Sequence, residues 1–297
     1  MTVALYAQAP PPPQPPAVVG MNRAILPEDI VNRVEALEKG RDWAELAAFI
    51  DTLSPSRQDQ LLPTHLKALQ GAGQLDRMLA LCRIKIPILD GPGGPRLSVA
   101  RIGEAQVLSK LGRHSEAAEA HRQNGRLGLA IGWSNALAEF RVAQDFTSLL
   151  ATAEEVLARV PRHPEATIYR GEALAKLGRY GEAEPALQAA IELDPKAAMA
   201  WANLACCRVE RSAFPEAIAA ADQALAMEPD NIEALYNRGR ARFGLRDYQN
   251  GRDDLTAALA LGKADPALRE NLQMNIGLAD RFLASQRKSA PKGSGKH

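Results

Sequence analysis

The chain has 297 residues, of which 46% are apolar but only 5% aromatic, so its core must consist mainly of Ala, Leu, Ile and Val. Such a composition suits closely packed helices. With 36 basic against 35 acidic residues the formal net charge is +1, so no overall field attracts nucleic-acid phosphates or anionic lipid. No segment reaches the roughly 18 uninterrupted apolar residues that span a bilayer. We therefore expect neither nucleic acid nor membrane among the partners.

Residues 1–24 are rich in proline, and we expect a disordered leader that is stiff from Pro10 to Pro16. Ala7-Gln8-Ala9 resembles a signal-peptidase site, but the apolar run before it is short and carries no basic residue. We therefore expect a cytoplasmic protein. The alternatives are export, if Met1 to Ala9 belongs to a truncated signal peptide, and a true start at Met21.

The three cysteines fit a reducing compartment. Cys82, Cys206 and Cys207 are odd in number and lack the spacing of a metal site. Adjacent cysteines rarely bond each other without distorted geometry. We expect small buried or half-buried side chains, with Cys206 facing a groove and Cys207 the packed interior.

A repeat runs through the chain. Each unit places a large residue, called its anchor, after a tight turn. The spacings between successive anchors are 32, 39, 32, 34, 34 and 34 residues. The anchors are Trp43, Leu75, His114, Phe146, Tyr180, Phe214 and Tyr248. Three identical steps of 34 indicate an array of similar structural units.

Each anchor lies between two stretches with helical patterns. In the best unit the helices span 166–176 and 183–193, Gly178 supplies a left-handed turn, and Asp194-Pro195 ends the second helix. Pro215 falls where a second helix begins. One hairpin cannot bury its apolar face alone, so neighbours must stack. Small residues that permit this stacking recur at Ala183, Ala190, Ala217, Ala224 and Ala258.

These residues resemble the tetratricopeptide repeat family, and more narrowly its bacterial members. The resemblance is strong over residues 131–265 and moderate from Arg101. It implies an all-α, right-handed superhelical solenoid of antiparallel helix hairpins. The matching positions are Trp133, Phe140, Phe146, Pro161, Gly171, Tyr180, Ala183, Ala190, Pro195, Trp201, Leu204, Ala217, Ala224, Pro229, Gly239, Tyr248 and Ala258. The chain departs from the pattern at Arg208, Arg242, Gly251 and Lys263.

The repeat divides the chain into segments. We expect degenerate helical hairpins over 25–97, with an insertion loop at Asp90 to Arg96, and the tetratricopeptide array over 98–265. A capping helix at 266–286 should cover the apolar end of the array, and 287–297 should be a disordered basic tail. The capping side chains would be Leu268, Leu272, Ile276, Leu278 and Leu283.

No pattern of residues indicates a catalyst, a metal site or a cofactor. The terminal GSGKH lacks the strand and helix of a phosphate loop, and His114 and His121 take packing positions with no further ligands. Glu154-Glu155 and Asp253-Asp254 are helix neighbours whose side chains point about 100° apart, so we expect solvated faces. We expect a non-catalytic protein.

The first helix of each hairpin lines the concave side. At its sixth position the chain carries a file of mostly carboxamide side chains: Asn135, Tyr169, Asn203, Asn237 and Asn271. Each carboxamide can bond the main chain of an extended peptide regardless of its sequence. Asn at this position is also common in the family, so the file is either functional or family consensus. Additional groove residues are expected to be Arg141, Glu172, Lys176, Tyr236, Arg240 and Phe243.

Family members that grip a C-terminal carboxylate resemble each other in having basic residues beside the central Asn. Here the flanks of Asn203 are Ile168 and Glu172 on one side and Glu233 and Asn237 on the other, which disfavours that clamp. The sequence thus predicts a monomeric adaptor whose groove binds an extended peptide of an unidentified protein. The alternatives are a self-assembling scaffold and an accessory that presents substrates to a separate transferase.

Overall fold

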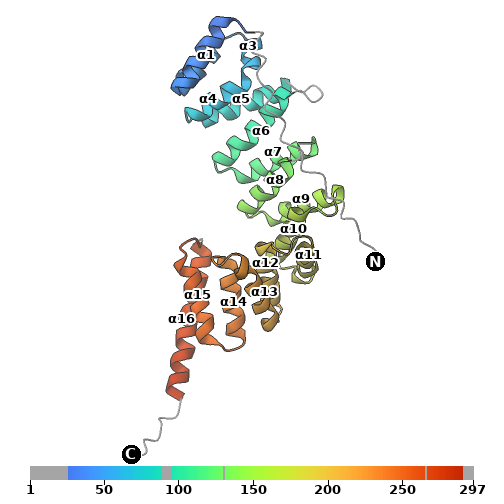
Figure 1. Cartoon of the computed structure of the whole chain (residues 1–297), viewed down its shortest axis with the longest axis vertical. Coiled ribbons are helices and arrows are strands. Elements are labelled where there is room, and N and C mark those ends of the chain that lie inside the picture. Colours follow the sequence, from blue (N-terminus) through green and yellow to red (C-terminus); the bar gives the residue numbers. More distant parts are fainter. Residues whose placement is uncertain (1–25, 89–94, 130, 265, 290–297) are drawn as a thin grey trace, which may run out of the picture. The chain divides into compact units, whose positions relative to one another are not determined.

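The computed structural model describes residues 26–88, 95–129, 131–264 and 266–289, and every regular element in these ranges is an α-helix (Figure 1). The expected leader and the insertion loop up to Gly94 lie outside the described residues, as does the tail beyond Ser289. The chain forms two compact units, 1–120 and 121–297, whose boundary falls within α7. Each unit is described by itself.

Unit 1 packs its helices around a leucine- and isoleucine-rich core. Leu46, Ile50, Leu62 and Leu69 are at most 1% exposed. The same unit buries polar groups, with Lys85 Nζ 2.6 Å from Asp59 Oδ1. Its helices are α1 (Glu28–Gly40), α2 (Trp43–Asp51), α3 (Pro55–Gln60), α4 (Leu62–Gly71), α5 (Leu75–Ile88), α6 (Pro95–Lys110) and the first half of α7 (His114–Arg126).

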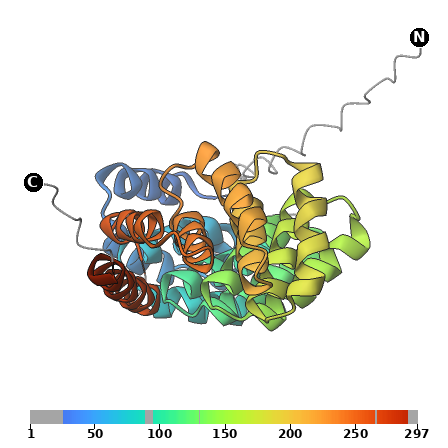
Figure 2. The ribbon, with the colours of Figure 1, turned by 90° about the horizontal axis from the view of Figure 1, so that it is seen from below.

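Unit 2 is a succession of helix hairpins that follow one another side by side (Figures 1 and 2). The first helices of neighbouring hairpins contact each other in the order α8, α10, α12 and α14. After the second half of α7, the helices are α8 (Ile131–Val142), α9 (Phe146–Arg159), α10 (Pro164–Lys176), α11 (Tyr180–Leu193), α12 (Ala198–Glu210), α13 (Phe214–Met227), α14 (Ile232–Gly244), α15 (Tyr248–Ala260) and α16 (Pro266–Ser289).

The phase of the repeat is confirmed at every unit, because each predicted anchor is the first residue of a helix. The small residues predicted to allow close stacking also lie in the interior, and all five have no exposed surface. The anchors Trp43, Leu75, His114, Phe146, Tyr180, Phe214 and Tyr248 begin α2, α5, α7, α9, α11, α13 and α15.

The turn inside each hairpin needs a left-handed residue two positions before the anchor. Gly178 takes this conformation with φ 75°. In other hairpins the same position holds residues with a side chain, at Gln144 (φ 56°), Ser212 (φ 60°) and Arg246 (φ 63°). A Cβ atom makes this conformation costly, so the turn geometry is imposed by the packing of the two helices it joins.

We expect Gly178→Ala to lower the free energy of unfolding by about 1 kcal/mol. A Cβ at Gly178 would meet no atom within 4 Å, so the cost arises from the backbone alone. Ser212→Gly should leave stability unchanged or raise it slightly, because relief of strain is offset by the larger entropy of the unfolded chain. Urea unfolding of both variants measures the two effects, and equal stability of Gly178→Ala and wild type would contradict the argument.

Two acidic pairs, Glu154-Glu155 and Asp253-Asp254, were expected to be solvated. In each pair, one side chain instead contacts arginines. Glu155 accepts hydrogen bonds from Arg122 Nε at 3.0 Å and Arg126 Nε at 2.8 Å. Asp254 is 5% exposed and accepts from Arg238 Nη2 at 2.7 Å. Their neighbours Glu154 and Asp253 are exposed. The expectation is therefore wrong for Glu155 and Asp254, because neighbouring helices bring arginines to that face.

The final helix, α16, packs on α15. Leu272 is fully buried, and Leu268 and Ile276 pack against the same cluster. Leu278 is 40% exposed, so its predicted capping role is wrong. Six residues after Leu272, it points to a different side of the helix, whereas spacings of three and four keep residues on one face.

Candidate functional site

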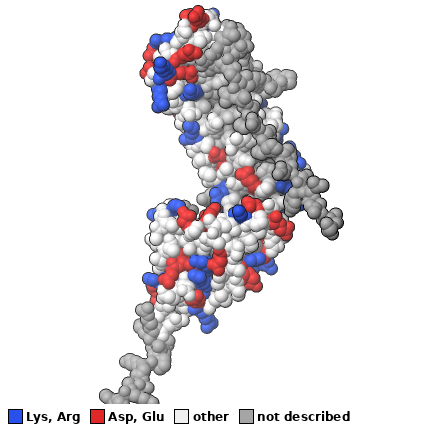
Figure 3. Space-filling model, in the orientation of Figure 1, with Lys and Arg blue, Asp and Glu red and all other residues white. Residues whose placement is uncertain are grey.

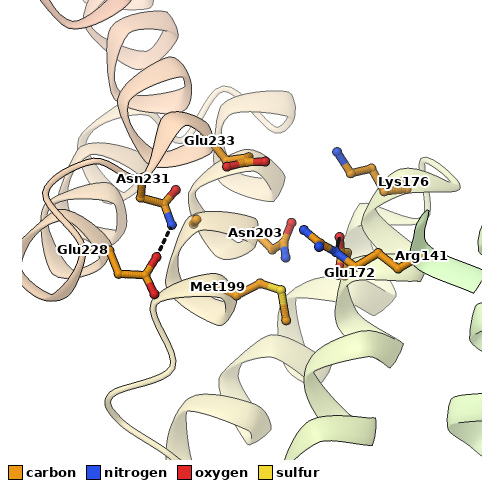
Figure 4. Close-up of a pocket in the computed structure, with 9 residues that line it drawn as sticks. Arg141, Glu172, Lys176, Met199, Asn203, Glu228, Asn231 and Glu233 are labelled. Carbon is orange, nitrogen blue, oxygen red and sulfur yellow. Dashed lines mark hydrogen bonds and ion pairs between the residues drawn. The ribbon is translucent and has the colours of Figure 1, made fainter. Parts of the chain in front are cut away.

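A cavity of about 290 Å³ opens among the first helices of unit 2 and the loop before α14 (Figure 4). Its lining includes four residues that the sequence analysis assigns to the groove: Arg141, Glu172, Lys176 and Asn203. The remaining lining residues are Met199, Ala202, Glu228, Asn231 and Glu233.

Asn203 lies in the middle of the cavity, on α12, which contacts both α10 and α14. It is 9% exposed. Among the described residues, its carboxamide has no hydrogen-bond partner. Neither carboxamide atom is among the fully buried polar atoms that lack a partner in the described residues, so the amide reaches the cavity and is open to a group that binds from outside.

Arg141 and Glu172 form an ion pair on one wall. Arg141 Nε donates to Glu172 Oε1 at 2.8 Å. Burial disfavours the Arg141 cation, but the Glu172 carboxylate outweighs this effect and raises the pKa of Arg141. Glu172 is 3% exposed, and its second oxygen, Oε2, is buried with no hydrogen-bond partner among the described residues. Lys176, one turn further along α10, is exposed.

The opposite wall is acidic and comes from the junction between α13 and α14. Asn231 caps α14, because its Oδ1 accepts from the Ala234 N–H at 2.9 Å. The same side chain donates from Nδ2 to Glu228 Oε2 at 2.9 Å, which fixes that carboxylate (Figure 4). Glu233 is exposed in the first turn of α14, where the helix dipole favours a negative charge.

Asn237 plays a part within the fold that the sequence did not indicate. It is 4% exposed, and its Nδ2 donates to the Ala202 carbonyl at 3.3 Å. This bond joins α14 to α12. Part of the hydrogen-bonding capacity of Asn237 is therefore used between neighbouring hairpins, and the carboxamide file is not uniform.

The other predicted groove residues lie outside this cavity. The Arg240 guanidinium stacks over the Tyr236 ring at 5.5 Å and pairs with Glu210 at 2.8 Å. Phe243 packs edge-on against Tyr248 of α15 with ring centroids 5.4 Å apart. Asn135 and Tyr169 are half-buried on α8 and α10, and Asn271 is exposed on α16.

The two adjacent cysteines lie in packed surroundings. Cys206 is half-buried and Cys207 is buried, and burial raises the pKa of the Cys207 thiol to about 12. Within the described ranges, no group of three or more His, Cys, Asp or Glu residues could hold a metal ion. No helix in the same ranges is long and apolar enough to span a membrane.

Three segments match a family model described as tetratricopeptide repeat: residues 139–198, 176–218 and 203–267. Curated relatives are eukaryotic. Human sperm-associated antigen 1 is 32% identical over 101 residues, covering 34% of this chain and 10% of the antigen. Human FK506-binding protein-like is 30% identical over 141 residues, covering 46% of this chain and 40% of that protein. The chain thus spans less than half the length of these relatives.

Solved structures with a similar arrangement include bacterial repeat proteins. A thermophilic tetratricopeptide repeat protein of Thermus thermophilus has a TM-score of 0.49 at 17% identity, covering 60% of this chain and 98% of the other. YrrB, whose structure is described as having an unusual peptide-binding site, has a TM-score of 0.43 at 20% identity, covering 60% and 92%.

Proposed function

We propose that this chain, whose residues 139–267 carry tetratricopeptide repeats, binds an extended segment of another protein in the groove between α8, α10, α12 and α14. The observation that carries this proposal is Asn203. The residue is 9% exposed and lines the cavity, and its carboxamide has no partner within the described residues.

Recognition would begin with the main chain of the bound segment. A carboxamide offers two donors and two acceptor positions, which match the C=O and N–H of an extended peptide. Asn203 has no internal partner among the described residues, whereas Asn237 already donates to Ala202. We therefore assign the main anchoring role to Asn203 and a lesser one to Asn237. The function is recognition, with no chemical step.

Asn203→Ala is expected to weaken binding by about 1–3 kcal/mol, because the peptide loses buried hydrogen bonds. The probes are peptides selected from a displayed random library on the wild-type chain. Their affinities for wild type and variant are then measured by fluorescence anisotropy. Because no internal bond of Asn203 is lost, the thermal unfolding midpoint should change little.

Asn250→Ala is the matched control, since Asn250 is exposed on α15 and does not line the cavity. Its affinity for the selected peptides should equal that of wild type. If Asn203→Ala and Asn250→Ala bind the peptides equally well, the groove is not the binding site.

A further inference from the structure

The two walls of the cavity carry opposite charges that do not pair with each other. Lys176 and Arg141 lie on one side and Glu228 and Glu233 on the other, with Asn203 between them (Figure 4). Within the described residues Arg141 pairs with Glu172, and no ion pair joins either cation to Glu228 or Glu233. Glu172 offsets the charge of Arg141, so Lys176 supplies the net positive charge of its wall.

Elsewhere in unit 2, several charges that face each other between helices are paired. Arg240 lies 2.8 Å from Glu210, Arg208 lies 3.3 Å from Glu184, and Arg238 lies 2.7 Å from Asp254. Acidic and basic side chains are also interspersed on the face of this unit drawn in Figure 3. Glu233 attracts Arg141 across the cavity without forming an ion pair, and Lys176, Glu228 and Glu233 are available to an external ligand.

Glu172 has one carboxylate oxygen that lacks a hydrogen-bond donor. Its Oε2 is buried and accepts no hydrogen bond among the described residues, although it belongs to a side chain that lines the cavity. A buried carboxylate oxygen without a donor is unfavourable. Because this oxygen has almost no accessible surface, an N–H of a bound main chain would reach it only after the Glu172 side chain turned toward the cavity.

We propose that the groove selects an extended segment that presents an acidic side chain to Lys176 and a basic side chain to Glu228 and Glu233. This inference rests on the proposed function, and it names the class of partner. A segment with two charges of one sign would meet one wall of like charge, which is unfavourable. Because the walls differ, the order of the two charges also fixes the direction in which the segment lies.

The test uses the full chain and labelled synthetic peptides with a neutral Ser-Ala frame. One set carries a Glu and a Lys in either order at varied separations, and comparison peptides carry two Glu, two Lys or two Ser. Anisotropy titrations give the affinities. At the best separation, one order should bind about tenfold more tightly than the reversed order and than the peptide with two Ser.

Charge-reversal variants then test which wall of the cavity selects which charge of the peptide. Glu233→Lys should shift the preference about tenfold toward the peptide with two Glu, and Lys176→Glu toward the peptide with two Lys. The double variant should prefer the reversed order. Both positions are exposed, so folding should be preserved, and circular dichroism checks this. Glu192→Lys is the control, because Glu192 is exposed on α11 and does not line the cavity.

Three negative results are distinguishable. Equal affinity for all peptides, with weaker binding by Asn203→Ala, would overturn the charge selection and leave the groove as the binding site. Failure of every synthetic peptide to bind, together with a library selection that yields no binding peptide, would overturn both proposals. Loss of preference in Glu192→Lys would show that net charge, rather than the walls of the cavity, decides affinity.

Discussion

Gly132→Ala is expected to lower the free energy of unfolding by about 3 kcal/mol, because the added methyl group has no room between α7 and α8. A Cβ at Gly132 would lie 2.5 Å from the backbone nitrogen of Gly125 and 2.5 Å from the carbonyl oxygen of His121. Backbone atoms within a helix cannot rotate away as a side chain can. The two helices would have to separate, and the packing of Trp133 on Gly125 would be lost with them.

Gly277→Ala is the matched control for this substitution. Gly277 lies inside α16, and a Cβ there would meet no atom within 4 Å. The change should raise stability by about 0.5–1 kcal/mol, since alanine is the better helix former. Guanidinium unfolding followed by circular dichroism compares the two variants. If Gly132→Ala were as stable as wild type while Gly277→Ala gained stability, the helices would adjust to the added methyl group without cost.

The fold was predictable because local sequence signals show where the helices of each repeat begin and which residues lie between hairpins. Large residues after the turns mark the start of each second helix, and alanines mark the contacts between hairpins. The left-handed turns at Gln144, Ser212 and Arg246 were not visible, because their side chains are not those that favour this conformation. The packing of the two helices imposes this conformation on the turn, and the residues of the turn alone do not indicate it.

The candidate site was predictable only in part. Arg141, Glu172, Lys176 and Asn203 lie around one cavity, and all four sit at inward positions of first helices. Glu228 and Asn231 were missed because they lie between hairpins, outside the helical pattern. The sequence Asn231-Ile232-Glu233 does carry the signature of a helix start, and this signal locates the acidic wall.

The hydrogen bond of Asn237 could not be predicted from its position in the repeat. Asn203 and Asn237 are equivalent in the repeat, yet only Asn237 donates to the preceding first helix. Which carboxamide is left free depends on how closely neighbouring helices approach. A periodic pattern predicts where such side chains lie but not which partners they find.

Glu155→Gln is expected to lower the free energy of unfolding by about 2 kcal/mol at neutral pH, because three arginines lose their shared carboxylate. Hydrogen bonds from Arg126 and Arg122 outweigh the effect of burial and hold the pKa of Glu155 at about 2. Arg159 Nη1 also donates to it at 3.2 Å. The Glu155 side chain is 19% exposed, so solvent screening makes the loss smaller than the pKa alone implies.

The effect of Glu155→Gln should also depend on pH in a defined direction. The folded pKa lies below the ordinary value of 4.5, so the stabilisation is fully present above pH 4.5 and is lost as pH falls toward 2. The stability difference between wild type and variant should therefore shrink to about half by pH 3. Urea unfolding across this range measures it. Glu154→Gln changes the exposed neighbour and should have little effect at any pH. A difference that stays constant from neutral pH to pH 3 would show that packing, and not the charge of Glu155, holds α7 and α9 together.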